Sequence, residues 1–254
     1  MTGLDQPARV VAVVGGISAT SAVLRRYAAV IEETAGLPTR VIASDYGLHD
    51  VASDVGAVVL VRTDPERVQR VRGSLVGVPV VTDQDTTAIA LAAALHTTLS
   101  RADRAPQSSQ VVIAGARTMP GLCPLVLAAG IGSITTWNPS DALVFPLRRI
   151  AADADVVINL VGGGGRFAWP RHAVPAVIVP DTGRDPLLAL PGLLQTLVRH
   201  PDTRLTVEMQ HACALALAAA TPPGNQLPRQ ADHALVTQVA DAATTALLSQ
   251  GDPR

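Results

Sequence analysis

Short apolar runs alternate along this chain with longer segments that are rich in alanine or have amphipathic spacing. The alternation predicts parallel α/β architecture, because the strands of a parallel sheet are buried on both faces and helices cover them. In the first half we expect strands at residues 9–14, 39–43, 57–61 and 78–81, and helices at 21–35, from about 64, and at 86–99. In the second half we expect strands at 111–114, 133–137, 156–161 and 176–179, and helices at 120–129, 141–152, 192–199, 206–220 and 232–249.

A polar connector separates the two series of strands and helices. Residues 100–110 read SRADRAPQSSQ, and a proline among polar neighbours is typical of a linker. We therefore expect an α/β domain over residues 1–105, a Rossmann-like domain over residues 106–225, and a C-terminal helix, within residues 226–254, that packs back on the first domain.

Composition and charge narrow the class of partner. The net charge of −1 and the pI near 6.6 provide no field that would attract nucleic acid or an anionic membrane. The uncharged stretch 118–140 contains prolines and glycines, which favours a buried helix and strand over a membrane span. Cys123 and Cys213 fit no metal-ligand spacing, and the N-terminal residues do not form a signal peptide, so we expect a cytoplasmic protein.

The basic residues limit the chemistry that is available. All 20 residues in the Lys+Arg total are arginine. No lysine can therefore act as a general base or form a Schiff base. The six histidines are scattered without a metal-binding pair, and we expect structural roles for them.

Several segments, taken in order, resemble the malic enzymes of the bacterial type. Residues 78–99, VPVVTDQDTTAIALAAALHTTL, resemble the family stretch I-P-V-F-H-D-D-Q-H-G-T-A-I and its following Ala/Leu-rich helix. Residues 111–131 resemble the first β–α turn of the nucleotide domain, and 187–223 resemble the L-A-F-P-G and I-T-x-E-M segments. Residues 27–42 align with K-A-L-L-F-K-x-F-A-G-V-D-A-F-P-I. The resemblance implies a truncated, degenerate homologue with two α/β domains, the second with a Rossmann-like parallel sheet, and a homodimeric assembly.

The resemblance also implies a catalytic apparatus that this chain has lost in part. Malic enzymes oxidise and decarboxylate malate with NAD(P), a divalent metal, a lysine base and a tyrosine acid. The lysine position falls on Tyr27, and the metal-binding Glu-Asp pair falls on Leu60 and Val61, which cannot bind a cation. The remaining metal-binding aspartate falls on Asp83 or Asp85. We predict no metal site and name Tyr27, Asp83 and Asp85 as candidate catalytic residues, although both aspartates open a helix, where capping alone would explain them.

The nucleotide-binding motif is altered as well. The glycine positions of G-x-G-x-x-G fall on Ala114, Ala116 and Met119, and the acidic residue that would bind a ribose hydroxyl is replaced by an asparagine. Six residues remain candidates for binding a cofactor or ligand. The glycines allow a ligand to approach the backbone closely, the asparagine offers an amide, and the arginines offer guanidinium groups that can bind an anion. The candidates are Gly115, Arg117, Asn138, Gly162, Gly163 and Arg184. Each of them also has a purely structural interpretation, as a solvated side chain or a loop glycine.

Three functions remain open on this basis. The favoured one is a metal-independent, non-redox enzyme of the lyase, isomerase or cyclase type, without a cofactor, acting on a small anionic molecule in the interdomain cleft. The second is an NAD(P)-dependent oxidoreductase acting on a 2-hydroxy or 2-oxo acid. The third is a non-catalytic binding or scaffolding subunit. We expect no nucleic-acid or membrane partner.

Overall fold

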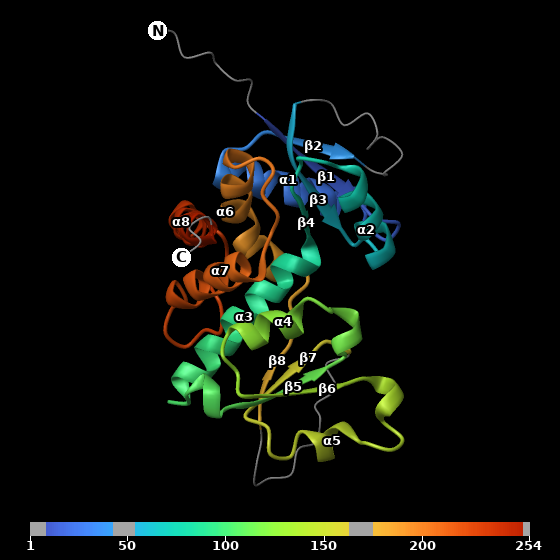
Figure 1. Ribbon diagram of the computed structural model, residues 1–254, viewed down its shortest axis with the longest axis vertical. Coiled ribbons are helices and arrows are strands. Elements are labelled where there is room, and N and C mark those ends of the chain that lie inside the picture. The colour runs from blue at the N-terminus through green and yellow to red at the C-terminus, as the bar shows by residue number, and fades with distance from the viewer. Residues whose placement is uncertain (1–8, 43–53, 163–174, 251–254) are drawn as a thin grey trace.

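The computed structural model describes residues 9–42, 54–162 and 175–250, which form two parallel four-stranded sheets with helices packed on them (Figure 1). The strands are β1 (Val10–Gly15), β2 (Thr39–Ile42), β3 (Val55–Val61) and β4 (Val80–Thr82) in the first sheet, and β5 (Gln110–Ala114), β6 (Ser133–Trp137), β7 (Val156–Asn159) and β8 (Ala176–Ile178) in the second. The helices are α1 (Ser21–Ala35), α2 (Pro65–Ser74), α3 (Asp83–Arg101), α4 (Leu122–Ala128), α5 (Leu147–Ile150), α6 (Asp185–Arg199), α7 (Val207–Ala219) and α8 (His233–Gln250). The predicted α/β fold class is confirmed.

The two sheets share one topology. Their strand orders are β2-β1-β3-β4 and β6-β5-β7-β8, and every pairing is parallel. All of β3 is buried, as its run of valines requires, whereas the edge strands β2 and β6 carry exposed polar residues. The order reverses between β1 and β3 and between β5 and β7, and open sheets of this kind bind ligands beyond the carboxyl ends of such strands.

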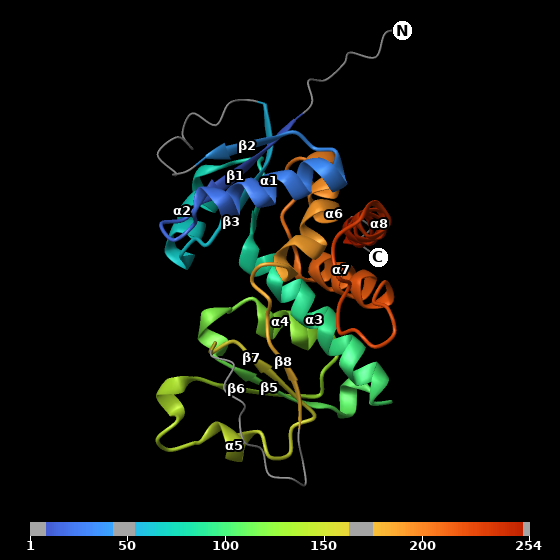
Figure 2. The same cartoon turned by 180° about the vertical axis from the view of Figure 1, so that it is seen from behind.

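Helix α3 connects the two sheets. It starts directly after β4 and runs to the second sheet, with α6 and α7 beside it and α8 packed on these two helices (Figure 2). Its alanine-rich middle is completely buried, and one apolar core continues across it from the first sheet to the second. Helices α6 and α7 pack against α3 and α8, and α6 also contacts α1. The domain boundaries stay a prediction. Among the helices described, none is both long and apolar enough to cross a membrane.

Two helix predictions were wrong in extent. The helix expected over residues 141–152 is reduced to α5, because Asp141 accepts the N–H of Asn138 in a tight turn and Pro146 stands immediately before the helical residues. The helix expected from residue 192 begins at Asp185 and contains Pro191. Burial of this helix against α3 and α8 offsets the missing N–H of the proline.

Candidate functional site

A cleft with a volume of about 600 Å³ lies where the carboxyl ends of strands from both sheets face each other. Its lining residues come from the loops after β1, β3, β5, β7 and β8, from the start of α3, and from α1 and α6. They are Ser18, Val23, Tyr27, Arg62, Thr63, Asp64, Asp83, Gln84, Thr87, Thr118, Met119, Leu160, Pro180, Thr182 and Pro186. The cleft therefore occupies the position that the topology of both sheets favours for a ligand.

Arg62 directly follows β3 and has an unusual backbone. Its φ of 53° lies in the left-handed region, which costs a non-glycine residue free energy. Its carbonyl packs so closely on Gly16 that a Cβ at that glycine would collide with it. The exposed guanidinium group donates from Nη1 to the carbonyl of Ser18 at 3.3 Å. This strained turn places a cation at the cleft.

Asp83, the first residue of α3, is held against this turn. Its Oδ2 accepts the backbone N–H of Arg62 at 2.9 Å. Burial raises the pKa of the Asp83 carboxyl above its ordinary value, while the N–H of Arg62 and the guanidinium charge act in the opposite direction. The side chain is consequently suited to exchanging a proton with a ligand in the cleft.

Tyr27 reaches the cleft from α1 and is 3% exposed. Burial raises the pKa of its phenol well above the ordinary value, the negative charge of Asp83 raises it further, and Arg62 and Arg26 lower it. The phenol is therefore a neutral hydrogen-bond donor at physiological pH. The helix residue Tyr27 is thus buried, with its phenol at the cleft.

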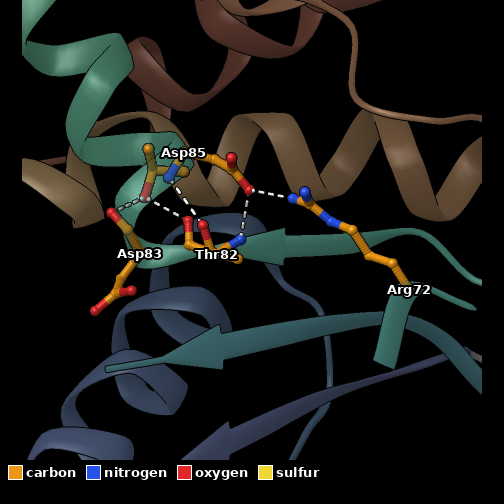
Figure 3. Close-up of polar contacts among 5 residues, drawn as sticks. Arg72, Thr82, Asp83 and Asp85 are labelled. Atoms are coloured by element: carbon orange, nitrogen blue, oxygen red, sulfur yellow. Dashed lines mark hydrogen bonds and ion pairs between the residues drawn. The ribbon is translucent and has the colours of Figure 1, made fainter. Parts of the chain in front are cut away.

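Asp85 points to the other side of the same helical turn (Figure 3). Its Oδ2 accepts the N–H of Thr82 at 2.9 Å, and its own N–H donates to Oγ1 of Thr82 at 2.9 Å, so the two residues form a capping box. The same Oδ2 forms an ion pair with Arg72 at 2.8 Å. The capping interpretation accounts for Asp85, and Asp83 is the aspartate that faces the cleft.

Gly115, Arg117 and Asn138 lie together beyond β5 and β6. Gly115 has φ 86°, and a Cβ there would lie 3.2 Å from the backbone of Leu160 and Val161, which explains the glycine. The backbone N–H of Arg117 donates to Oδ1 of Asn138 at 3.1 Å, and the Arg117 side chain is exposed. The structure thus brings three predicted residues together, Gly115 and Arg117 from the turn after β5 and Asn138 from the end of β6.

The backbone N–H groups of the turn after β5 are poorly placed to bind a pyrophosphate. Besides Arg117, the N–H groups of Thr118, Met119 and Leu122 donate to the carbonyls of Gly115, Ala116 and Met119. A Rossmann turn binds phosphates with backbone N–H groups that have no partner within the chain. These four donors are already used, which weighs against a dinucleotide held by them.

The remaining predicted residues lie beyond β7 and β8. Gly162 has φ 73° and is exposed, and Gly163 lies outside the described residues. Arg184 donates from Nη2 to Oδ1 of Asp185 at 2.8 Å, and Asp185 is 1% exposed. The guanidinium of Arg184 therefore already binds a carboxylate, which belongs to the chain itself.

The donor set at the cleft does not fit a dedicated divalent-cation site. Leu60 and Val61 are buried in β3, and Asp64 caps α2 by accepting the N–H of Arg67 at 2.9 Å. Across residues 9–42, 54–162 and 175–250, no group of three His, Cys, Asp or Glu side chains could hold a metal ion. A hard cation needs several oxygen ligands, and Asp83 alone does not supply them.

Sequence comparison finds no matching family profile and no matching curated protein. Solved structures do match. The NAD-dependent malic enzyme of Thermotoga maritima has 17% sequence identity over 93% of this chain and 84% of its own, with a TM-score of 0.77. The malic enzyme of Pyrococcus horikoshii has 16% identity over 97% and 78%, with a TM-score of 0.76. The chain has the malic-enzyme fold. The enzyme of Entamoeba histolytica, with 16% identity over 97% of this chain and 71% of its own, has the same TM-score of 0.76. The resemblance read from the sequence is thereby confirmed at the level of the fold.

Within this malic-enzyme fold, sequence reasoning missed Arg62. The residue directly follows a buried strand, where the side chains of a parallel sheet reach a ligand, and that position was the available signal. Its left-handed backbone and its bond to Asp83 had no counterpart in the sequence pattern.

Proposed function

We propose that this protein is a metal-independent, non-redox enzyme of the lyase, isomerase or cyclase type, acting on a small anionic molecule in the cleft. The observation that carries the proposal is the meeting of Asp83, Tyr27 and Arg62 at one cleft. A carboxyl group with a raised pKa, a neutral phenol and a guanidinium group are sufficient for proton transfer next to an anionic group.

In this mechanism Arg62 binds a carboxylate or phosphate of the substrate. Asp83 removes a proton from a neighbouring carbon, and the electron pair left behind moves onto a carbonyl oxygen. The phenol of Tyr27 donates a hydrogen bond to that oxygen. Return of the proton to another carbon gives isomerisation, and loss of a leaving group gives elimination.

The proposal selects Asp83 over Asp85 as the acid/base. Both open α3, but Asp85 is bound to Thr82 and Arg72 on the opposite side. The loops of the second sheet contribute Thr118, Met119 and Leu160 to the cleft, whereas Gly115, Arg117 and Asn138 are not among its lining residues. A homodimer and a cytoplasmic location remain predictions.

The alternative is an NAD(P)-dependent oxidoreductase, which the fold shared with an NAD-dependent malic enzyme favours. The internally bonded turn after β5 weighs against it. Titration with NADH and NADPH, followed by cofactor fluorescence, separates the two. Saturable binding below millimolar cofactor would support the alternative and contradict our proposal.

Proton abstraction can be tested before the substrate is known. The purified chain is incubated in D₂O with a panel of 2-oxo, 2-hydroxy and unsaturated carboxylic acids, and loss of C–H signals is followed by NMR. We expect catalysed exchange that is unchanged by a chelator, abolished in Asp83→Asn and slowed at least about tenfold in Tyr27→Phe. Asp85→Asn, which changes the same group on the opposite side of the turn, is the matched control and should retain exchange. Wild-type exchange that persists in Asp83→Asn would refute the assignment, and binding of an acid without exchange would favour a non-catalytic subunit.

A further inference from the structure

A second groove, also of about 600 Å³, lies on another part of the molecule. One wall is formed by the end of α2 and the loop leading into β4, and the other by the loop between α6 and α7. The lining residues are Gln69, Arg72, Gly73, Leu75, Val76, Gly77, Val78, Pro79, Val80, Asp202, Thr203, Arg204 and Leu205. This set shares no residue with the lining of the cleft, and the volume is in the range of small-molecule sites.

The groove combines cationic groups with an apolar wall. Arg72 and Arg204 come from segments that are far apart in the sequence and line the same groove. Arg72 forms an ion pair with Asp85, whereas Arg204 has no ion-pair partner among the residues that the structure describes. Asp202 is the one carboxylate of the lining, and it packs on Gly77, where a Cβ would lie 2.7 Å from its Oδ1. Val76 is 92% exposed and extends the apolar surface.

We propose that this groove is a second ligand site, which binds a small anion with an apolar portion through Arg72 and Arg204. Arg204 is the guanidinium group of the groove without an ion-pair partner among the described residues, and Arg72 supplies a second one when an anion competes with Asp85 for it. Guanidinium groups bind carboxylate and phosphate with strong, directional hydrogen bonds. The ligand class is therefore a small carboxylate or phosphate ester whose apolar part lies along Leu75, Val76 and Leu205.

Arg72 connects this groove to the cleft. Its guanidinium binds Asp85, Asp85 binds the N–H of Thr82, and Asp83 follows on the other side of the same turn (Figure 3). An anion in the groove competes with Asp85 for Arg72. Its binding accordingly changes the surroundings of Thr82 and Asp83 without entering the cleft.

Calorimetric titration at low ionic strength tests the site directly, with inorganic phosphate and hexanoate as probes. We expect saturable binding of one equivalent that is retained in Arg62→Gln and therefore does not depend on the cleft, and the tighter probe identifies the preferred anionic group. Arg204→Gln should weaken binding at least about tenfold. Arg70→Gln removes the same charge from an exposed position on α2 outside the groove and should leave binding unchanged.

The outcomes separate this site from the cleft. Binding that is lost in Arg62→Gln but retained in Arg204→Gln would place the anion in the cleft and overturn the proposal. No saturable binding of either probe would overturn the proposal. A wild-type dimer that Arg204→Gln dissociates would overturn it in favour of an interface between two copies of the chain. For the connection, the amide signals of Thr82 and Asp83 should shift on addition of the tighter probe in the wild type and not in Arg204→Gln. Unshifted amides would refute the connection even where anion binding is found.

Discussion

The carboxylate of Asp83 accepts the backbone N–H of Arg62 at 2.9 Å, and this bond joins the first turn of α3 to the end of β3. It holds Arg62 in a left-handed conformation that an arginine rarely adopts. The bond lies beyond the carboxyl ends of β3 and β4, beside the place where strand order reverses between β1 and β3, and both residues line the cleft. Strain that persists at such a place is typical of functional sites.

Relief of this strain should stabilise the protein while removing its ligand-binding cation. Arg62→Gly fits the φ of 53° and should raise the free energy of unfolding by about 1 kcal/mol. Asp103, with φ 51° after α3, is the matched control, because Asp103→Gly should stabilise similarly without affecting the cleft. Urea unfolding measures stability, and titration with an acid identified in the exchange panel measures binding. Undiminished binding in Arg62→Gly would refute the role of Arg62.

The capping box predicts unequal effects from the two partners of one ion pair. Asp85→Ala removes the acceptor of the Thr82 N–H together with the ion pair, and should lower the free energy of unfolding by about 1–2 kcal/mol. Arg72→Gln removes the ion pair alone. Because the Arg72 side chain is 36% exposed, its loss should cost less than about 1 kcal/mol. Equal losses in urea unfolding would show that the ion pair, and not the cap, stabilises this turn.

The fold could be predicted where local signals agree with packing. The helix over residues 21–35 was placed correctly at both ends, because Thr20 caps its first turn and Gly36 adopts the left-handed conformation that ends it. The strand at residues 133–137 was also placed correctly at both ends. The start of α6 was missed because Pro191 reads as a boundary, and only burial between α3 and α8 shows why the helix continues through it.

The site could be predicted only in part for the same reason. Asp83 and Asp85 are indistinguishable in sequence, and the helical turn that separates their directions becomes visible in three dimensions (Figure 3). Arg62 depends on contacts with Gly16 and Asp83, which are distant in sequence. Long-range contacts of this kind leave no periodic pattern.

Two stacked histidines between α3 and α7 predict a pH-dependent stability. The rings of His96 and His211 have centroids 5.5 Å apart, and neither buried Nε2 has a hydrogen-bond partner within the described part of the chain. Burial lowers the pKa of both imidazoles, and His211 lowers that of His96 further. The unfolded chain, with histidine pKa values of about 6.5, therefore binds protons that the folded chain does not.

The contribution of this histidine pair to the free energy of unfolding is fully present above about pH 6.5. It declines as the pH falls towards the lowered pKa values of the two imidazoles in the folded chain. The buried carboxyl groups of Asp83 and Asp185 change stability in the opposite direction as the pH falls. Burial raises their pKa values, so protonation removes the cost of burying a charged carboxylate and stabilises the folded chain. The comparison must therefore be made against variants. The double variant His96→Gln, His211→Gln should lose less stability than the wild type between pH 7.5 and 5.5 in urea unfolding. Parallel pH profiles would contradict the assignment.

The contact between α6 and α8 predicts opposite effects for two glycine-to-alanine substitutions. A Cβ at Gly192 would lie 2.5 Å from the carbonyl oxygen of Val236 and 2.8 Å from Cβ of Val239, so Gly192→Ala must push the two helices apart. Overpacking of this kind should lower the free energy of unfolding by about 1–3 kcal/mol. Gly73 in α2 has no atom within 4 Å of such a Cβ, and Gly73→Ala should stabilise by about 0.5–1 kcal/mol through helix propensity. Thermal or urea unfolding of both variants checks the pair, and a stabilised Gly192→Ala would show that the contact between α6 and α8 has room for a methyl group.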